Sequence, residues 1–306
     1  MNSSQATRVT PAHHALALDI GGSHVSAAVI NLESGSILSA SETRASVNPD
    51  ASAQHLLEAW STTALVAHDL AACPRIVHVG IAMPGPFEYA TGISRLKHKF
   101  EALYGANIGE ALSQVFEPKL GIVPVYFGND ATLFALGEWW AGAARGYARV
   151  LGVTLGTGLG GGFVVAGLPC YGGEGLPPNG AIWNLPYLHG IAEDAVSGRA
   201  LELAYHRRTG QARSPVQIAQ TANHGDDAAQ TAFLELGIHL GRILKPWVTS
   251  FQPSCLVVGG NLARAWHLFC QPLEAELRDQ KLEVRASTLY DAANLFGAAA
   301  LGVHQP

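Results

Sequence analysis

The clearest hydrophobic pattern in the chain is a pair of short apolar runs separated by a glycine-rich turn, and this pattern occurs twice. Between 151 and 165 the sequence reads LGVTLGTGLGGGFVV, with β-forming residues on both sides of the glycines. Between 17 and 30 it reads ALDIGGSHVSAAVI, with the same order of apolar run, small-residue turn and apolar run. We interpret each segment as a β-hairpin, and the repeat predicts two equivalent half-domains that face one ligand.

Glycines crowd the turn of the second hairpin, at positions 156, 158, 160, 161 and 162. Because glycine tolerates positive φ and lets a ligand approach the backbone, we predict that successive N–H groups of this turn cradle phosphate oxygens. The spacing also matches GxGxxG, which would indicate a dinucleotide-binding turn, but such a turn opens a helix and β-forming residues follow here. A tight hairpin without any ligand is the alternative that the local sequence leaves open.

The turn of the first hairpin contains Gly21, Gly22 and Ser23, and an acidic residue precedes it. Asp19 stands at the end of the first apolar run. A carboxylate at this position could hold a hydrated Mg²⁺ ion against bound phosphates. We therefore predict a second anion-binding turn with a metal-binding carboxylate beside it.

Another apolar run, at 75–82, leads into the sequence MPGP at 83–86. Two prolines make this turn rigid, and α/β proteins place ligands beside turns that follow a strand. Pro84 and Gly85 are therefore candidate substrate contacts.

The apolar run at 121–127 is followed by Asn129 and Asp130, and residues 131–143 then have helical character. Both side chains are good helix caps, and capping alone could explain them. The functional interpretation is that Asp130 accepts a proton from a substrate hydroxyl while Asn129 orients that substrate.

The remaining pattern predicts an alternation of helices and strands. Helical spacing of apolar residues is found in the segments 51–72, 108–116, 226–250 and 262–277. A further helix is expected after Glu193 and Asp194, where the paired acids suit either a first helical turn or a sugar hydroxyl. The strand expected at 255–258 ends in GGN at 259–261, a turn at which a nucleotide base or ribose could lie.

Composition adds several exclusions to this picture. With 48% hydrophobic and 14% charged residues among 306, the chain is globular and long enough for two lobes. The net charge of −5 offers no basic surface for nucleic acid. Four scattered cysteines without a CxxC pair indicate neither a disulfide framework nor a zinc site. No signal peptide and no apolar run near the ~20 residues that span a bilayer are found, so we expect a cytoplasmic protein without membrane contact.

Five segments, in this order, resemble the motifs of the ROK family of sugar kinases and repressors, which belongs to the hexokinase, Hsp70 and actin superfamily. They are DIGGS at 19–23, GIAMPGPFE at 80–88, GNDA at 128–131, LGTGLGGG at 155–162 and VVGGN at 257–261. The resemblance covers nearly the whole chain. It implies an α/β protein with the two-lobed actin-like ATPase (ribonuclease H-like) fold, duplicated β-hairpin phosphate loops and a cleft between the lobes.

The resemblance also implies how the chain is divided. Residues 1–14 would be disordered or extended, and 15–127 would form the N-terminal lobe, with 291–306 packing back onto it. Residues 128–290 would form the C-terminal lobe. Similar proteins are often dimers, so a homodimer is expected.

By the same resemblance, the protein would use ATP to phosphorylate a hydroxyl of a hexose, an amino sugar or a related polyol. Asp130 would be the general base, and Asp19 would lie near Mg²⁺. The ATP-binding positions implied by the family are Gly21, Gly22, Ser23, Gly156, Thr157, Gly158, Gly160, Gly259, Gly260 and Asn261. The candidate substrate contacts are Pro84, Gly85, Lys99, Asn129, Asn184 and Glu193.

The chain departs from the family pattern at several places. The Cys-rich zinc motif and its preceding histidine are missing, so no structural zinc is predicted. The family's Gly-Glu-Ile-Gly-His stretch appears as GAIWN at 180–184, with Ala181 for the glutamate and Asn184 for the histidine, while Glu193 fits a later glutamate. Lys99 stands where many members have Pro-Asn-Leu, and its charge would suit an anionic ligand, whereas a solvated basic loop is the alternative that the local sequence favours. These changes predict an acceptor other than plain glucose.

Other functions compete with that of a kinase. The changes at 181 and 184 favour, as the alternative, a catalytically weak sugar- or nucleotide-binding protein, a pseudokinase or sensor. A ROK-like repressor carries a helix-turn-helix ahead of the kinase-like body, and only about 14 residues precede the first strand here. An NAD-dependent dehydrogenase would need a helix after the glycine turn, and a P-loop enzyme would need a Gly-Lys pair that the sequence lacks.

Overall fold

The computed structural model describes residues 13–303, and it contains two sheets that repeat one topology. The strand order is β3-β2-β1-β5-β8 in the first sheet, with β4 paired to β2, and β11-β10-β9-β14-β15 in the second. The first sheet consists of β1 (His14–Ile20), β2 (His24–Asn31), β3 (Ser36–Ile37), β4 (Thr43–Ser46), β5 (Ile76–Met83) and β8 (Val125–Asn129). The second consists of β9 (Arg149–Leu155), β10 (Leu159–Val165), β11 (Leu168–Cys170), β14 (Cys255–Gly259) and β15 (Glu283–Ala286).

Each sheet contains an antiparallel hairpin that is continued by parallel strands. β1 pairs antiparallel with β2 and parallel with β5, and β5 pairs parallel with β8. In the second sheet β9 pairs antiparallel with β10 and parallel with β14, and β14 pairs parallel with β15. Both hairpins predicted from the glycine turns are therefore present, and the two turns join equivalent strands.

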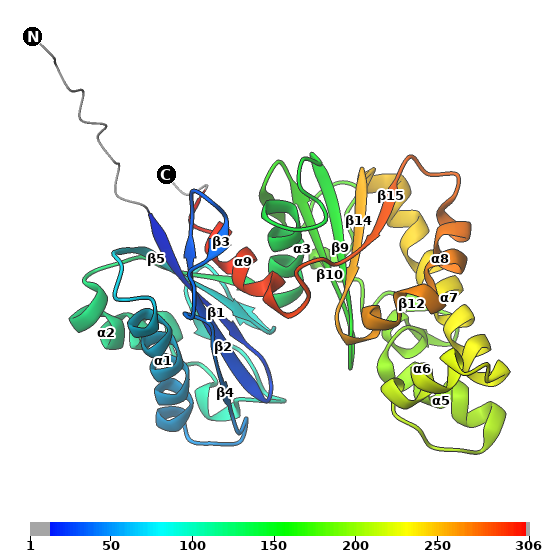
Figure 1. The fold of residues 1–306 in the computed structure, drawn as a ribbon, viewed down its shortest axis with the longest axis horizontal. Coiled ribbons are helices and arrows are strands. Elements are labelled where there is room, and N and C mark those ends of the chain that lie inside the picture. Colours follow the sequence, from blue (N-terminus) through cyan, green and yellow to red (C-terminus); the bar gives the residue numbers. More distant parts are fainter. Residues whose placement is uncertain (1–12, 304–306) are drawn as a thin grey trace, which may run out of the picture.

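Helices flank both sheets (Figure 1). They are α1 (Ala53–Leu70), α2 (Ile108–Leu120), α3 (Asp130–Trp140), α4 (Ala192–Ala195), α5 (Gly198–Thr209), α6 (Pro215–Asn223), α7 (Asp227–Phe251), α8 (Cys270–Leu277) and α9 (Ala293–Ala300). The 3-10 helices are η1 (Glu101–Leu103), η2 (Pro178–Gly180), η3 (Asn261–Leu268) and η4 (Tyr290–Ala292). The small hairpins are β6 (Phe87–Glu88) with β7 (Ile93–Ser94), and β12 (Pro186–Tyr187) with β13 (Gly190–Ile191).

Helices α3 and α9 lie between the two sheets and share one apolar core with the inner faces of both (Figure 1). The two helices meet backbone to backbone. A β-carbon at Gly137 of α3 would stand 2.0 Å from the carbonyl oxygen of Ala293, and one at Gly297 of α9 would stand 1.9 Å from that of Leu133. Because a side chain at either position would force the helices apart, these glycines set how closely the sheets approach each other.

Separate apolar cores fill the outer faces of the sheets. Helices α1 and α2 cover the first sheet, where Trp60 and Phe100 are fully buried with their ring centroids 5.2 Å apart. Helices α5 to α8 cover the second sheet, where the rings of Phe163 and Phe251 lie 5.0 Å apart. The core of each half therefore depends on aromatic side chains, whereas the core between the sheets is made largely of small residues.

The structure corrects two of the predicted elements. The helix expected at 262–277 is divided into η3 and α8, and the break falls at Phe269, whose φ of −134° is not helical. The strand expected at 121–127 begins only at Val125, because α2 continues to Leu120 and ends at Gly121 with a φ of 76°. This shift includes Asn129 in β8 and makes Asp130 the first residue of α3.

The division into lobes at 127/128 and 290/291 remains our proposal, and the two separate outer cores support it. Of the segment expected to be disordered or extended at 1–14, residues 1–12 lie outside the described residues, as do 304–306, while His14 already begins β1. Across residues 13–303, none of the helices has the length and apolar character that crossing a membrane requires.

Candidate active site

The carboxyl ends of three parallel strands bring the first group of predicted site residues to one edge of the first sheet. Asp19 of β1 pairs with Ala82 of β5, and Ala82 pairs with Gly128 of β8, two residues before Asp130. Because neighbouring strands lie about 4.8 Å apart, this register places the backbones at Asp19 and Gly128 roughly 10 Å from each other. Open α/β sheets bind ligands at such an edge.

Asp130 stands at the start of α3, but it is not the cap of that helix. The cap is Asn129, whose Oδ1 accepts hydrogen bonds from the N–H groups of Ala131 and Thr132 at 3.1 and 3.3 Å. The capping interpretation therefore holds for Asn129. The carboxylate of Asp130 accepts the N–H of Ala131 at 2.9 Å. Burial raises the pKa of Asp130 and the positive charge of Lys99 lowers it, so the group is a stronger base than an exposed aspartate.

A residue that the sequence did not single out, Tyr89, connects the second and third strand ends. Its hydroxyl donates to the carbonyl oxygen of Met83 at 3.2 Å and accepts from Nδ2 of Asn129 at 3.1 Å. A β-carbon at Gly85 would lie 3.3 Å from this hydroxyl. Burial raises the pKa of Tyr89, which keeps the hydroxyl protonated. The predicted contacts Gly85 and Asn129 are thus brought together, and a hydrogen bond from the side chain of Asn129 also lowers the pKa of Asp130.

Asp19 shares a buried hydrogen bond with the far end of the chain. Nδ2 of Asn294, at the start of α9, donates to Oδ1 of Asp19 at 3.0 Å. Burial raises the pKa of Asp19 to about 7, and the negative charge of Asp130 contributes to the rise. The other amide atom, Oδ1 of Asn294, is buried without a hydrogen-bond partner. A carboxylate beside an unpartnered amide oxygen is the donor set that a hydrated Mg²⁺ ion prefers, so these residues fit the predicted metal.

The first glycine turn leaves its backbone donors available. Gly21 donates its N–H to the carbonyl oxygen of His24 at 2.9 Å, which closes the turn. The N–H groups of Gly22 and Ser23 have no acceptor among residues 13–303. Two adjacent unpaired N–H groups at a tight turn are the donor pattern that an anion-binding turn needs, and anion binding here stays a prediction.

The glycines of the second turn do not have the positive φ that the sequence analysis expected of them. None of the five glycines at 156, 158, 160, 161 and 162 has a positive φ. Most are required for close packing instead. A β-carbon would stand 2.3 Å from Glu193 at Gly158, 2.8 Å from Ala131 at Gly160, 2.7 Å from Ile182 at Gly161 and 2.5 Å from the carbonyl oxygen of Ala131 at Gly162. Only Gly156 has open space there. The glycines let β10 lie against the first turn of α3, beside Asp130.

Two backbone donors of the second turn are nevertheless unpaired. Gly156 donates to the carbonyl oxygen of Gly158 at 3.0 Å, and the N–H groups of Thr157 and Gly158 have no acceptor in the part of the chain that the structure describes. Glu193 supports the turn from behind. One of its oxygens accepts from the N–H of Leu159 and the other from Arg199, both at 3.0 Å. Because each carboxylate oxygen can accept a second hydrogen bond, these contacts leave room for a sugar hydroxyl, and a sugar contact by Glu193 stays a prediction.

The third glycine turn lies beside the second. Gly259 of β14 pairs with Thr154 of β9, and a β-carbon at Gly260, whose φ is 80°, would stand 2.3 Å from the carbonyl oxygen of Leu155. Gly260 therefore needs to be glycine for both its conformation and its packing. Asn261 follows as an exposed residue at the start of η3. Asn184 is also exposed, and the described residues include no hydrogen-bond partner for it.

A family model matches residues 15–305, and its description is the ROK family. The chain belongs to the ROK family. The match includes both hairpins, the strand ends at Asp19 and Asp130 and the third glycine turn. The resemblance that the five sequence motifs indicated is thereby confirmed.

Known relatives of this ROK protein include several sugar kinases. The glucokinase of Thermotoga maritima is 28% identical over 73% of this chain and 78% of its own length. The N-acetylgalactosamine kinase AgaK of Shewanella sp. strain ANA-3 is 30% identical over 73% of this chain and 77% of its own length. A ROK family glucokinase from Streptomyces griseus, solved in complex with glucose and AMPPNP, has a TM-score of 0.75 at 25% identity and covers 94% of this chain and 98% of that one. These similarities confirm the two-lobed fold class.

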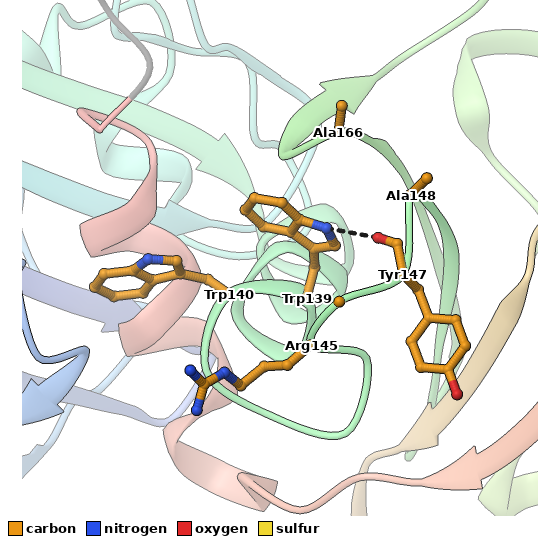
Figure 2. A pocket seen from close by; sticks show the side chains of 7 residues that line it. Trp139, Trp140, Arg145, Tyr147, Ala148 and Ala166 are labelled. Atoms are coloured by element: carbon orange, nitrogen blue, oxygen red, sulfur yellow. Dashed lines mark hydrogen bonds between the residues drawn. The ribbon is translucent and has the colours of Figure 1, made fainter.

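A cavity of about 370 Å³ lies elsewhere in the ROK fold. It is lined by Trp139, Trp140, Arg145, Gly146, Tyr147, Ala148 and Ala166 (Figure 2). Trp139 donates from Nε1 to the carbonyl oxygen of Tyr147 at 2.8 Å, which holds the two sides of the cavity together. Because α3 rises about 1.5 Å per residue, Trp139 is roughly 14 Å from Asp130 along the helix. The cavity is therefore outside the candidate active site.

One cluster of three His, Cys and acidic side chains is present among residues 13–303, and it lies outside the site. His68, Asp69 and Cys73 bring their ligand atoms within 4.8 Å of one another at the end of α1. Asp69 is already paired with Lys119, and Nε2 of His68 is hydrogen-bonded to the carbonyl oxygen of Pro74. These contacts provide a structural explanation for the group.

Proposed function

We propose that this ROK protein transfers the terminal phosphoryl group of ATP to a hydroxyl of a hexose, an amino sugar or a related polyol. The observation that carries the proposal is the meeting of Asp130 with the glycine turns, since β10 packs on the first turn of α3 through Gly160 and Gly162. A nucleotide held by the turns would present its phosphates beside a partly buried carboxylate. The names of the relatives, glucokinase and N-acetylgalactosamine kinase, support the same reaction.

In the proposed reaction, the acceptor oxygen forms a bond to the γ-phosphorus while the bond from that phosphorus to the β,γ-bridging oxygen breaks. The hydroxyl proton passes to the carboxylate of Asp130, and ADP leaves with the electron pair of the broken bond. The free N–H groups of the turns, at Gly22, Ser23, Thr157 and Gly158, hold the phosphate oxygens. The contribution of the protein is mainly positioning and charge stabilisation.

We propose that Mg²⁺ is held, through water, by Asp19 and Oδ1 of Asn294. The ion would neutralise charge on the phosphates when it is bound. With a pKa near 7 in its absence, Asp19 changes its protonation state close to neutrality, and a bound cation would favour the ionised form. This proposal is supported by the unpartnered amide oxygen beside the carboxylate.

The acceptor would lie against Pro84, Gly85 and Asn129 on the first sheet, with Asn184 and Glu193 approaching from the second half of the chain. Closure of the two halves would exclude water, which would otherwise compete with the acceptor hydroxyl. Ala181 and Asn184 provide neither the carboxylate nor the imidazole expected from the family pattern. We therefore propose an acceptor class broader than glucose, with amino and N-acetyl sugars included.

The location and the assembly are also proposals. All four cysteines lie in the described residues and are free, which suits a reducing cytoplasm. The net charge of −5 argues against a nucleic-acid partner. A homodimer follows only from the family resemblance and would be tested by light scattering.

The decisive experiment measures ADP release with Mg²⁺ and ATP across hexoses, amino sugars, N-acetyl sugars and inositols. Wild type is compared with Asp130→Asn and with Asp279→Asn, an exposed aspartate that serves as the matched control. We expect a sugar-dependent signal that Asp130→Asn lowers at least 10²-fold and the control leaves unchanged. Equal activity in Asp130→Asn would refute the role of the base. Silence of the wild type, in a protein that binds a sugar or ATP, would favour a sensor instead.

A further inference from the structure

Lys99 reaches over the first glycine turn. Its Cδ atom lies 3.7 Å from the place where a β-carbon at Gly22 would stand, so the aliphatic part of the side chain contacts the turn whose N–H groups are free. The residue is partly buried, and it has no ion-pair or hydrogen-bond partner in residues 13–303. Its ammonium group is therefore available to pair with a ligand that carries negative charge.

The backbone beside Lys99 is firmly anchored. Phe100 has a φ of 54°, in the left-handed region, and donates its N–H to the carbonyl oxygen of Pro49 at 3.0 Å. Its ring is completely buried and packs edge to face on Trp60. An aromatic residue adopts this backbone conformation only where its surroundings compensate for the strain. The anchor therefore fixes the point from which Lys99 extends over the turn.

The same side chain acts electrostatically on the proposed base. The charge of Lys99 lowers the pKa of Asp130, against the effect of burial, while the aliphatic part of the same side chain contacts Gly22. The other charges that act on this edge are Asp19, Asp291 and Arg44. Arg44 is exposed on the outer strand β4, whereas Lys99 is partly buried. Negative groups thus dominate the edge, and ATP would add more.

We infer that the ammonium group of Lys99 contacts the terminal phosphoryl group of ATP as that group passes to the acceptor, an inference that rests on the proposed kinase function. The side chain contacts Gly22 of the turn that we propose binds phosphate, and its charge acts on Asp130, so it lies near the proposed path of the transferred group. During transfer the negative charge is spread over three phosphoryl oxygens, and a lysine supplies a compact point charge there. Lys99 is then a catalytic residue of phosphoryl transfer rather than a contact for an anionic sugar.

The first test measures binding and needs no acceptor. Equilibrium affinities for ADP and for AMPPNP, each with Mg²⁺, are determined by calorimetry for wild type, Lys99→Met and Lys99→Arg. Lys97→Met is the matched control, since Lys97 is an exposed lysine of the same loop that lies over the ring of Tyr104. We expect Lys99→Met to weaken AMPPNP about tenfold while ADP changes less than twofold, because only AMPPNP carries a γ-phosphate. The affinities of Lys99→Arg for both nucleotides should stay within about threefold of wild type, and those of the control should match wild type.

Equal weakening of both nucleotides by Lys99→Met, or no weakening of either, would overturn the inference. Thermal melting of each variant, compared with wild type, shows whether a loss of binding reflects a loss of folding. If Lys99→Met melts at a lower temperature than wild type, the Lys99→Arg variant decides whether the inference holds. It must retain the preference of wild type for AMPPNP over ADP.

The second test measures turnover with whichever sugar the panel identifies. We expect Lys99→Met to lower kcat about 10²-fold while KM for the sugar stays within threefold. A rise in KM for the sugar with kcat retained would show that Lys99 binds the acceptor, and the inference would be wrong. If no sugar supports ADP release by wild type, the proposed function fails, whereas the comparison of AMPPNP with ADP still decides the role of Lys99.

Discussion

A β-carbon at Gly22 in the first hairpin would meet only the Lys99 side chain, at 3.7 Å, whereas one at Gly158 in the second would stand 2.3 Å from a Glu193 oxygen. The turns join equivalent strands of two similar sheets. The first is open to a ligand and approached by a lysine, while the second is supported from behind by a carboxylate and by α3. Both turns keep unpaired N–H donors, but only the second is also packed against a helix and a carboxylate.

The largest effect is expected from filling the packed side of the second hairpin. In Gly162→Ala the new β-carbon would stand 2.5 Å from the carbonyl oxygen of Ala131 and 2.6 Å from Cα of Thr132, so the backbone of α3 must move. We expect a loss of about 3 kcal/mol in the free energy of unfolding, measured in urea. Gly156→Ala is the control, since a β-carbon there meets nothing within 4 Å, and it should cost under ~0.5 kcal/mol. Similar losses in both would mean that packing does not distinguish these glycines.

The second effect concerns the carboxylate that only the first hairpin carries. The pKa of Asp19 is raised from 3.8 to about 7 by burial, with Asp130 and Asp291 adding to the rise and Asn294 and Arg44 opposing it. The folded protein then binds a proton that the unfolded chain releases, so stability is greatest below pH 4 in this respect and falls as pH rises toward 7.

We expect the free energy of unfolding of Asp19→Asn to rise by about 2 kcal/mol relative to wild type between pH 4 and pH 8. This is less than the full change in the pKa of Asp19 would give, because the residue is partly solvated. Urea unfolding at a series of pH values without Mg²⁺ measures this difference. Parallel pH profiles for the two proteins would show that the pKa of Asp19 does not change on folding.

A third experiment tests whether Glu193 explains the glycine at 158. Gly158→Ala places a β-carbon against the carboxylate that accepts the N–H of Leu159, and we expect a loss of about 1.5 kcal/mol. In a Glu193→Ala background the same change should cost at least ~1 kcal/mol less, because the obstructing group is gone. A double-mutant cycle by urea unfolding gives the coupling energy. A coupling energy of zero would show that Glu193 is not the reason for the glycine at position 158.

The smallest effect is expected at the edge of the first sheet. Tyr89→Phe removes the hydroxyl that links Asn129 to the carbonyl oxygen of Met83, and we expect a loss of about 1 kcal/mol in stability. Sugar-dependent ADP release should fall several-fold, mainly through KM, because Asn129 is less firmly held. Tyr104→Phe, at an exposed tyrosine, is the control. Unchanged kinetics in Tyr89→Phe would make the tyrosine purely structural.

Much of the first sheet edge could be predicted from local sequence, because a strand followed by a turn places the turn at a sheet end whatever the partner strands are. Asp19 and Asp130 were identified in this way, and the register of β1, β5 and β8 brings their strand ends together. Tyr89 was missed because its role depends on a hydrogen bond to a residue 40 positions away. The only local signal was its position six residues after the end of β5.

The sequence by itself determined the two hairpins, since apolar runs around small-residue turns form strands with little help from the rest of the chain. It also determined the family, through five motifs in order. Only the tertiary structure decided why the glycines of the second turn are glycines, because their neighbours, Ala131, Ile182 and Glu193, come from other elements. It also brought Asn294 to Asp19 across 275 residues. Such contacts depend on how α3 and α9 pack between the sheets, which no local pattern specifies.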